Sequence, residues 1–262
     1  MMTTEAMLAY HGDPALKAAV LAQMADHRAA ERLVKGTYWS WTSGRGCAVG
    51  CLTYNPTGGH AEYPERWGIP EKLAWLEDAV FEHLPLDHAT AWPLRFLAAI
   101  EPGSDLSGIY AAWSAALMLD PERGNITRCA GSLEAESAVR RVAGLWQVRS
   151  AEPVEWSTAA GAAESAAESA ACSAKPATSA AAESAARSAW SSARSAESTQ
   201  AAASAAYNAA GSAWWQARST RASAASAPLA WLAHWRWMAD LLIAFVEAAP
   251  VAMLAEPERV GR

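Results

Sequence analysis

Residues 38–67, YWSWTSGRGCAVGCLTYNPTGGHAEYPERW, form the stretch around which the rest of the chain is organised. It holds two of the four cysteines, one of the six histidines and a dense group of aromatic residues. The sequence after it consists of helical patterns separated by Pro and Gly, which predicts an all-α fold of helices packed on helices. A chemical site, if the protein has one, is expected within this stretch.

The residues up to about position 150 predict a compact multi-helix domain. Asp13 as cap and Pro14 at the first helical position begin a helix that Gly36 ends after Lys35. Apolar residues at helical spacing predict further helices from Pro70 to Pro85, from Trp92 to Ile100, from Ser104 or Asp105 through Leu117, and one that ends near Val148.

Residues 157–226 differ abruptly in composition, because 30 of these 70 positions are Ala, 16 are Ser, and none is Val, Ile, Leu, Met or Phe. Ala is the strongest helix former and Ser costs only a few tenths of a kcal/mol more, so we expect ordered helices. Pro176 must break them, giving one helix before it and one or two after, with Gly211 as a second weak point. Buried Ala yields little free energy, so the apolar final helix from Pro228 to Pro250 is expected to clamp the thin helices together.

These patterns predict three regions. A helical domain with a Cys/Gly/Trp-rich loop covers residues 1–150, an Ala/Ser-rich helical bundle or hairpin covers 151–248, and a polar tail covers 249–262. Because small side chains allow close approach of helices, the Ala faces are also expected to pair between subunits or with a partner, giving a homo-oligomer through the Ala-rich helices.

Composition excludes several classes of protein. The net charge of −6 argues against a nucleic-acid binder, which needs clustered Lys and Arg. Four cysteines in 262 residues do not form a secreted disulfide framework, and the N-terminus lacks a signal-peptide pattern. The most apolar run, 228–254, is interrupted by charged residues, so no membrane span is expected. We therefore expect a cytoplasmic, reduced protein.

Four sequence blocks in the first half resemble a family of uncharacterised phage and bacterial proteins: GRGCAVGCL (44–52), HAEY (60–63), WGIPEKLAWLEDAVFEHLP (67–85) and AWPLRFLAAI (91–100). The resemblance implies a phage or prophage setting and no particular reaction. The second half is similar in composition to the Ala-repeat helices of Imm-5-like immunity proteins, which implies an immunity-type role.

Cys47 and Cys51 lie four positions apart and share a helical face if this segment is helical. In the simplest interpretation both are small buried apolar residues. A zinc site with His60 would need a fourth ligand and lacks a second matching pair, so no metal is predicted. As a nucleophile, Cys47 would have its pKa lowered by a helix N-terminus and by Arg45, with His60 as base and Glu62 as the residue that orients it.

The same loop has a binding interpretation. Gly44, Arg45 and Gly46 could present backbone N–H groups and a charge to an anion, while Tyr38, Trp39 and Trp41 could stack on a ring. The leading functional hypothesis is a non-enzymatic binding or inhibitor-type protein, without a cofactor, for a small anionic or aromatic ligand or a protein partner. A thiol-dependent hydrolase or transferase centred on Cys47 and a structural helix-pairing module are the alternatives.

Overall fold

The structure is a computed structural model that describes residues 7–129, 131–148, 151–172, 176–219 and 226–252. It confirms the all-α fold, since one two-stranded antiparallel ribbon is the only sheet within these ranges. The first elements along the chain are η1 (Ala9–Gly12), α1 (Pro14–Ala29), β1 (Trp39–Ser40), β2 (Arg45–Gly46), α2 (Ala48–Thr53), η2 (His60–Glu62), α3 (Tyr63–Trp67), α4 (Glu71–His83), α5 (Leu86–Ala89) and α6 (Trp92–Ala99). They are followed by α7 (Ile109–Leu119), η3 (Asn125–Arg128), α8 (Leu133–Val148), α9 (Pro153–Ala171), α10 (Pro176–Arg194), α11 (Ala201–Ser219) and α12 (Ser226–Glu247).

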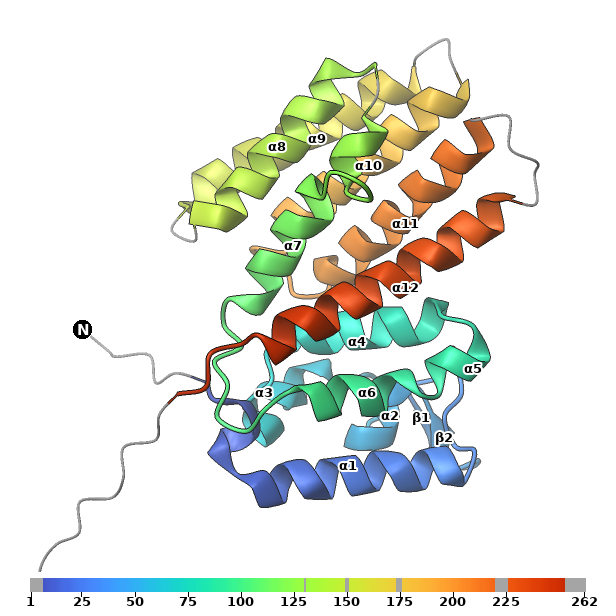
Figure 1. The fold of residues 1–262 in the computed structure, drawn as a ribbon, viewed down its shortest axis with the longest axis vertical. Coiled ribbons are helices and arrows are strands. Elements are labelled where there is room, and N and C mark those ends of the chain that lie inside the picture. The colour runs from blue at the N-terminus through green and yellow to red at the C-terminus, as the bar shows by residue number, and fades with distance from the viewer. Residues whose placement is uncertain (1–6, 130, 149–150, 173–175, 220–225, 253–262) are drawn as a thin grey trace, which may run out of the picture.

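The helices form two stacked parts joined by α12. Figure 1 shows α1–α6 in the lower part, α7–α11 as an upper bundle, and α12 running diagonally between them. Helix α12 packs on α11, and also on α7, α4 and α6. Among the Ala-rich helices its main contact is with α11, whereas α9 and α10 pack on each other and on α8, so the expected clamp holds for α11 only. In the upper bundle α8 packs on both α9 and α10, so residues on each side of position 150 share one hydrophobic core.

The Ala-rich segment is ordered helix where the structure describes it. Helix α10 lies between α9 and α11, and the Ala side chains on the facing sides of all three helices are buried within the chain. Ala205 and Ala209 of α11, for example, are fully buried. The Ala faces are therefore used for packing inside the protein.

Two helix boundaries differ from the predicted ones. Helix α1 ends at Ala29 rather than near Lys35, because Glu31 adopts a left-handed conformation and Leu33 then bridges to Gly46. In the Ala-rich segment α9 ends at Ala171 and α10 begins at Pro176, as predicted, with 173–175 outside the described residues. The second break differs from the prediction: it falls between Arg194 and Ala201, and α11 continues through Gly211. At that break the Ser195 hydroxyl donates a hydrogen bond to the Ser192 carbonyl. Such local side-chain bonds compete with the backbone hydrogen bonds of a helix.

Both ends of the described chain meet at one loop. The Ala9 N–H donates to the Ser104 carbonyl and the Gly103 N–H to the Ala9 carbonyl. From the other end, the Pro250 carbonyl accepts from the Asp105 N–H, and Ser104 bridges to Val251. Residues 250–252 of the predicted polar tail are thus tied to residues 103–105, while 253–262 lie outside the described residues.

Helix α12 is long and apolar enough to cross a membrane by length and composition. Within the protein, however, Trp235, Met238, Leu242 and Val246 of this helix are buried against neighbouring helices. His234 is also buried, and Arg95 pairs with Asp240 on the exposed side. One face of α12 therefore packs inside the protein, and 33% of its most apolar window is buried there.

Two glycines of the 38–67 stretch are required by close backbone packing. A Cβ atom on Gly50 would lie 1.4 Å from the carbonyl oxygen of Tyr38, and one on Gly46 would lie 1.9 Å from the same oxygen. The chain therefore passes over α2 at a distance that only glycine permits.

Replacing Gly50 with Ala should lower the free energy of unfolding by at least about 2 kcal/mol, since backbone must move on both sides of the contact. The matched control is Gly161→Ala in α9, where a Cβ meets nothing within 4 Å. That change should raise the free energy of unfolding by about 0.5–1 kcal/mol, because Ala is the better helix former. Urea denaturation of both variants measures the contrast, and equal effects would contradict the close packing.

Candidate functional site

Cys47 caps the N-terminus of α2 and is 1% exposed. Its Sγ accepts a hydrogen bond from the Gly50 N–H at 3.5 Å, so the predicted position at a helix N-terminus is confirmed. The predicted lowering of its pKa is wrong, because burial and the neighbouring Asp78 carboxylate raise the pKa of this thiol, outweighing the Gly50 bond. Cys51 is also fully buried and its pKa is raised to about 12, chiefly by burial.

The expected Cys47–His60–Glu62 arrangement is not assembled. The Nε2–H of His60 donates to Asp78 Oδ2 at 3.2 Å, and its ring stacks on Trp75 with 3.6 Å between centroids. Glu62 instead accepts from Asn55 at 2.8 Å and pairs with Arg66 at 3.0 Å. Asp78 therefore holds His60 in the way we expected of Glu62, and this carboxylate lies beside the Cys47 thiol.

The glycine loop does not form the expected anion cradle. The N–H of Gly44 donates to the Ser40 carbonyl at 2.8 Å, that of Gly46 to Arg32 at 3.0 Å, and that of Cys47 to Thr37 at 2.6 Å. All three donors are thus satisfied by backbone within the protein. Arg45 is exposed, and a role for it in ligand binding stays a prediction.

The three aromatic residues of the loop do not share one wall. Strand alternation turns Tyr38 towards His60, whereas Trp39 packs edge-on against Tyr54 with 4.9 Å between ring centroids. Trp41 stacks on Tyr54 and is 70% exposed. Trp39, Trp41 and Tyr54, with His27, form an aromatic cluster at the surface, and its part in binding is untested.

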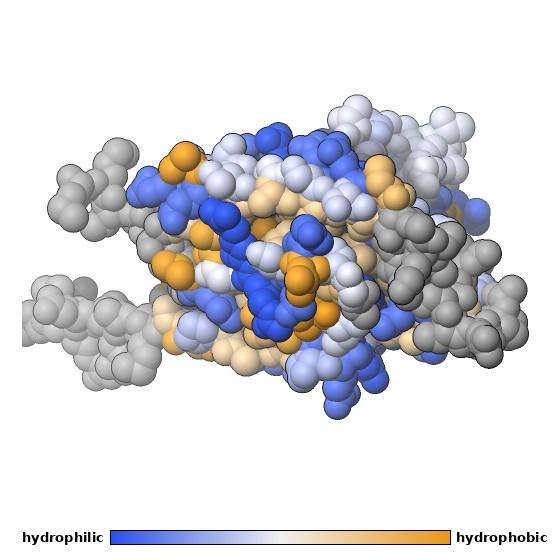
Figure 2. All heavy atoms as spheres, turned by 90° about the horizontal axis from the view of Figure 1, so that it is seen from above, coloured by the Kyte–Doolittle hydropathy of each residue, from blue (hydrophilic) through white to orange (hydrophobic). Residues whose placement is uncertain are grey.

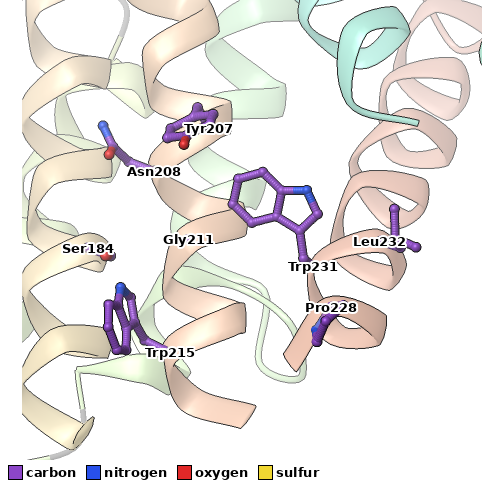
Figure 3. Close-up of a pocket in the computed structure, with 8 residues that line it drawn as sticks. All are labelled: Ser184, Tyr207, Asn208, Gly211, Trp215, Pro228, Trp231 and Leu232. Atoms are coloured by element: carbon purple, nitrogen blue, oxygen red, sulfur yellow. The ribbon is translucent and has the colours of Figure 1, made fainter. Parts of the chain in front are cut away.

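A larger groove lies between α11 and α12. This aromatic groove, of about 600 Å³, is lined by Ser184, Tyr207, Asn208, Gly211, Trp215, Pro228, Trp231 and Leu232. Figure 3 shows the Trp231 ring extending from α12 towards α11, where Gly211 separates Tyr207 from Trp215. Tyr207 and Trp231 meet edge-to-face with 5.2 Å between centroids. Among the described residues, the lining contains aromatic rings, two neutral polar side chains and no charged residue.

A second pocket between α11 and α12 has the opposite character. This basic pocket, of about 440 Å³, is lined by Arg123, Arg128, Ala213, Gln216, Ala230, Ala233 and His234. Two of its polar side chains are buried: Arg128 is 6% exposed and His234 is 3% exposed. The Arg128 guanidinium donates to the Arg123 carbonyl and to His234 Nδ1, the latter at 3.3 Å.

The basic pocket presents hydrogen-bond donors. Since a guanidinium can only donate, Nδ1 of His234 must accept and the proton of the neutral ring must lie on Nε2. That Nε2 and the Nε of Arg128 are both buried without a partner in the described structure. Burial first, and then the charges of Arg128 and Arg123, lower the pKa of His234 well below its ordinary value, which keeps the ring neutral.

No carboxylate forms an ion pair with Arg123 or Arg128 in the part of the chain that the structure describes. The nearby Asp120 raises the pKa of Arg128, but burial outweighs it and the pKa falls to about 10. The Oδ1 of Asp120 accepts from the backbone N–H groups of Glu122 and Arg123. The sequence did not reveal this pocket, because Arg128 and His234 are 106 positions apart.

The burial of Cys47 predicts that its thiol reacts slowly with alkylating reagents. In the native protein near neutral pH, iodoacetamide should label one thiol quickly, Cys172, which is exposed, while Cys47, Cys51 and Cys129 are buried. Intact mass spectrometry should show this single adduct disappear in a Cys172→Ser variant. In denaturant all four cysteines should react. Fast native labelling of Cys47 would contradict the burial and would favour a thiol enzyme.

Comparison with known proteins adds no relative to this description. A scan against protein-family models, a search of curated proteins and a search of solved structures each find no match to this chain. The two pockets and the surroundings of Cys47 are therefore the features from which a function can be inferred.

Proposed function

We propose that this protein is a non-enzymatic binding protein that takes up a small anion, carrying a carboxylate or phosphate group, in the basic pocket. The observation that carries the proposal is the guanidinium of Arg128, which is 6% exposed and forms no ion pair with a carboxylate among the described residues. Asp120 is near enough to raise the pKa of Arg128, but burial outweighs this interaction. Buried charges are normally paired directly, and an anion in the pocket would supply such a partner.

The chemistry of the pocket selects the ligand class. Arg128 Nε–H and His234 Nε2–H are unpartnered donors, and Arg123 adds a second cation at the rim. A ligand that accepts two or more hydrogen bonds and carries negative charge satisfies all three groups, as carboxylates and phosphates do. The remaining lining residues are Ala213, Gln216, Ala230 and Ala233, and the three small Ala side chains leave room for a small apolar body.

Calorimetric titration of the full chain with sodium phosphate and with sodium acetate, at matched ionic strength, tests this proposal. We expect saturable binding of at least one of the two anions, which also shows which group the pocket prefers. Arg128→Met should weaken that binding at least about tenfold, since a charged hydrogen bond is lost. The matched control is Arg236→Gln, which removes an exposed charge from the same helix as His234 and should leave binding unchanged.

Circular dichroism of Arg128→Met establishes that the variant is folded. If neither phosphate nor acetate binds to the wild-type protein, or if Arg236→Gln weakens binding as much as Arg128→Met does, the basic pocket is not an anion site. Equal loss in both variants would indicate attraction by the overall surface charge.

The aromatic groove supports a second candidate function, the binding of a flat, neutral aromatic molecule. Its volume of about 600 Å³ lies within the usual range of small-molecule sites, and its rings are suited to stacking. Ser184 and Asn208 supply neutral polar groups at the α10 side of the groove, where they could orient a ligand (Figure 3).

N-phenyl-1-naphthylamine, a neutral aromatic dye whose fluorescence rises in apolar surroundings, probes this groove. Trp231→Ala removes one wall and should weaken dye binding several-fold. Gly211→Leu should do the same by filling the floor, where a Cβ meets Ser184 only at an ordinary 3.7 Å. The control is Trp41→Ala, which removes the 70% exposed ring near the Cys47 loop. Loss of dye binding in that variant alone would assign the aromatic ligand to the 38–46 loop.

Other parts of the hypothesis remain proposals with lighter support. A phage or immunity-type role rests on the resemblance of the sequence blocks, and a cytoplasmic location on the unpaired cysteines of the described chain. Self-association would need a surface other than the buried Ala faces, and on the face seen in Figure 2 hydrophobic residues lie in separate patches between hydrophilic ones. A thiol enzyme is less favoured, because burial and then the neighbouring Asp78 carboxylate raise the pKa of Cys47.

A further inference from the structure

We infer that Cys47, Asp78 and Glu82 form a binding site for a divalent transition-metal ion of the zinc type. One donor atom from each residue, the Cys47 Sγ and a carboxylate oxygen of Asp78 and Glu82, lies within 4.8 Å of the other two. We call these three residues the thiol–carboxylate cluster. It is separate from both pockets between α11 and α12.

The cluster gathers three acidic donors where water is scarce. Cys47 is 1% exposed and Asp78 is 8% exposed, and Glu82 is half-buried. Like-charged groups this close repel each other when ionised, and in a buried site a cation removes that repulsion. The nearby ammonium of Lys35 donates to the backbone carbonyls of Glu82 and Leu84. The Gly36 N–H donates to both carboxylate oxygens of Glu82 at 3.0 Å. Burial nevertheless raises the pKa of Glu82, outweighing the Gly36 bond and the charge of Lys35.

Asp78 supplies an independent sign of a missing ligand. Its Oδ2 accepts from His60 Nε2 at 3.2 Å, while its Oδ1 is buried and has only the weak donor of the neighbouring Cys47 thiol near the carboxylate. A carboxylate that ligates a metal is usually held by a hydrogen bond of its own, as His60 holds Asp78 here. His60 is itself fixed by stacking on Trp75, so Asp78 is oriented before any ion arrives.

The donor set and the space indicate the kind of ion. One thiolate with two carboxylates suits zinc, which accepts sulfur and oxygen ligands, better than calcium or magnesium, which take oxygen alone. Tetrahedral zinc places its ligand atoms about 3–4 Å apart, so the cluster would contract by about 1 Å. A cavity of about 260 Å³, lined by Gly36, Thr37, Tyr38, Asp78 and Glu82, offers an entry path and room for a water molecule as fourth ligand.

Cobalt titration of the full-length Cys172→Ser protein tests the site, because the exposed thiol is removed and thiolate-bound Co²⁺ absorbs in the near ultraviolet. We expect one equivalent of Co²⁺ to give this charge-transfer band and one equivalent of Zn²⁺ to abolish it. Adding Cys47→Ser should eliminate the band, and Asp78→Asn should weaken Co²⁺ binding at least about tenfold. The matched control is Cys51→Ser, one helical turn away and also buried, which should keep the band.

A second variant, Glu82→Gln, is less disruptive to the fold because Glu82 is only half-buried. The Glu82→Gln protein should remain helical by circular dichroism and bind Co²⁺ more weakly. The inference is overturned if the Cys172→Ser protein shows no saturable Co²⁺ binding. It is equally overturned if the band survives Cys47→Ser, or if it is lost in Cys51→Ser while that variant remains folded.

Discussion

The close contact of Ala-faced helices is the constraint on which the rest of this structure depends. Helix α10 packs on α9 and α11 mainly through Ala and Ser side chains, so the three backbones approach closely while little apolar area is buried per residue. Hydrogen bonds therefore have to fix the register of the bundle. Ser188 accepts from Asn125 at 2.9 Å and donates to the Ala205 carbonyl at 2.8 Å, and the Trp146 Nε1–H donates to Ser192 at 2.9 Å. The serines thus specify the packing that alanine permits.

The same constraint explains where the pockets lie. Helix α12 carries large side chains and faces α11, whose side chains are mostly small, so the two surfaces do not interdigitate along their whole length. One gap on this interface became the aromatic groove and another the basic pocket. Tryptophan is suited to the edges of such gaps, because a single ring covers a wide opening at low conformational cost. This role explains part of the high tryptophan content of the chain.

The sequence predicted what local chemistry decides. Helix propensity and Pro176 predicted the Ala-rich helices, and the apolar stripe after Pro228 predicted the final helix. The Asp13 cap predicted the first residue of α1 correctly. The sites were harder, because their residues meet only in three dimensions: Asp78 reaches Cys47 from a helix 31 positions away, and His234 meets Arg128 across 106. The glycine loop was misinterpreted, since nothing in GRG shows that Tyr38 passes over Gly46 and Gly50 and that neighbouring carbonyls occupy the N–H groups.

The tie between both ends of the described chain and the loop at 103–105 brings residues 9 and 250 to the same place. Ala9 and Pro250 each hydrogen-bond that loop, so a linker between these two residues would not have to cross the bundle. New ends could then be opened at Glu197 and Ser198, which are exposed in the turn between α10 and α11. Circular permutation could therefore change the order in which the helices are synthesised without changing their arrangement in space. Such a variant would test whether the lower part must fold before the alanine bundle can assemble.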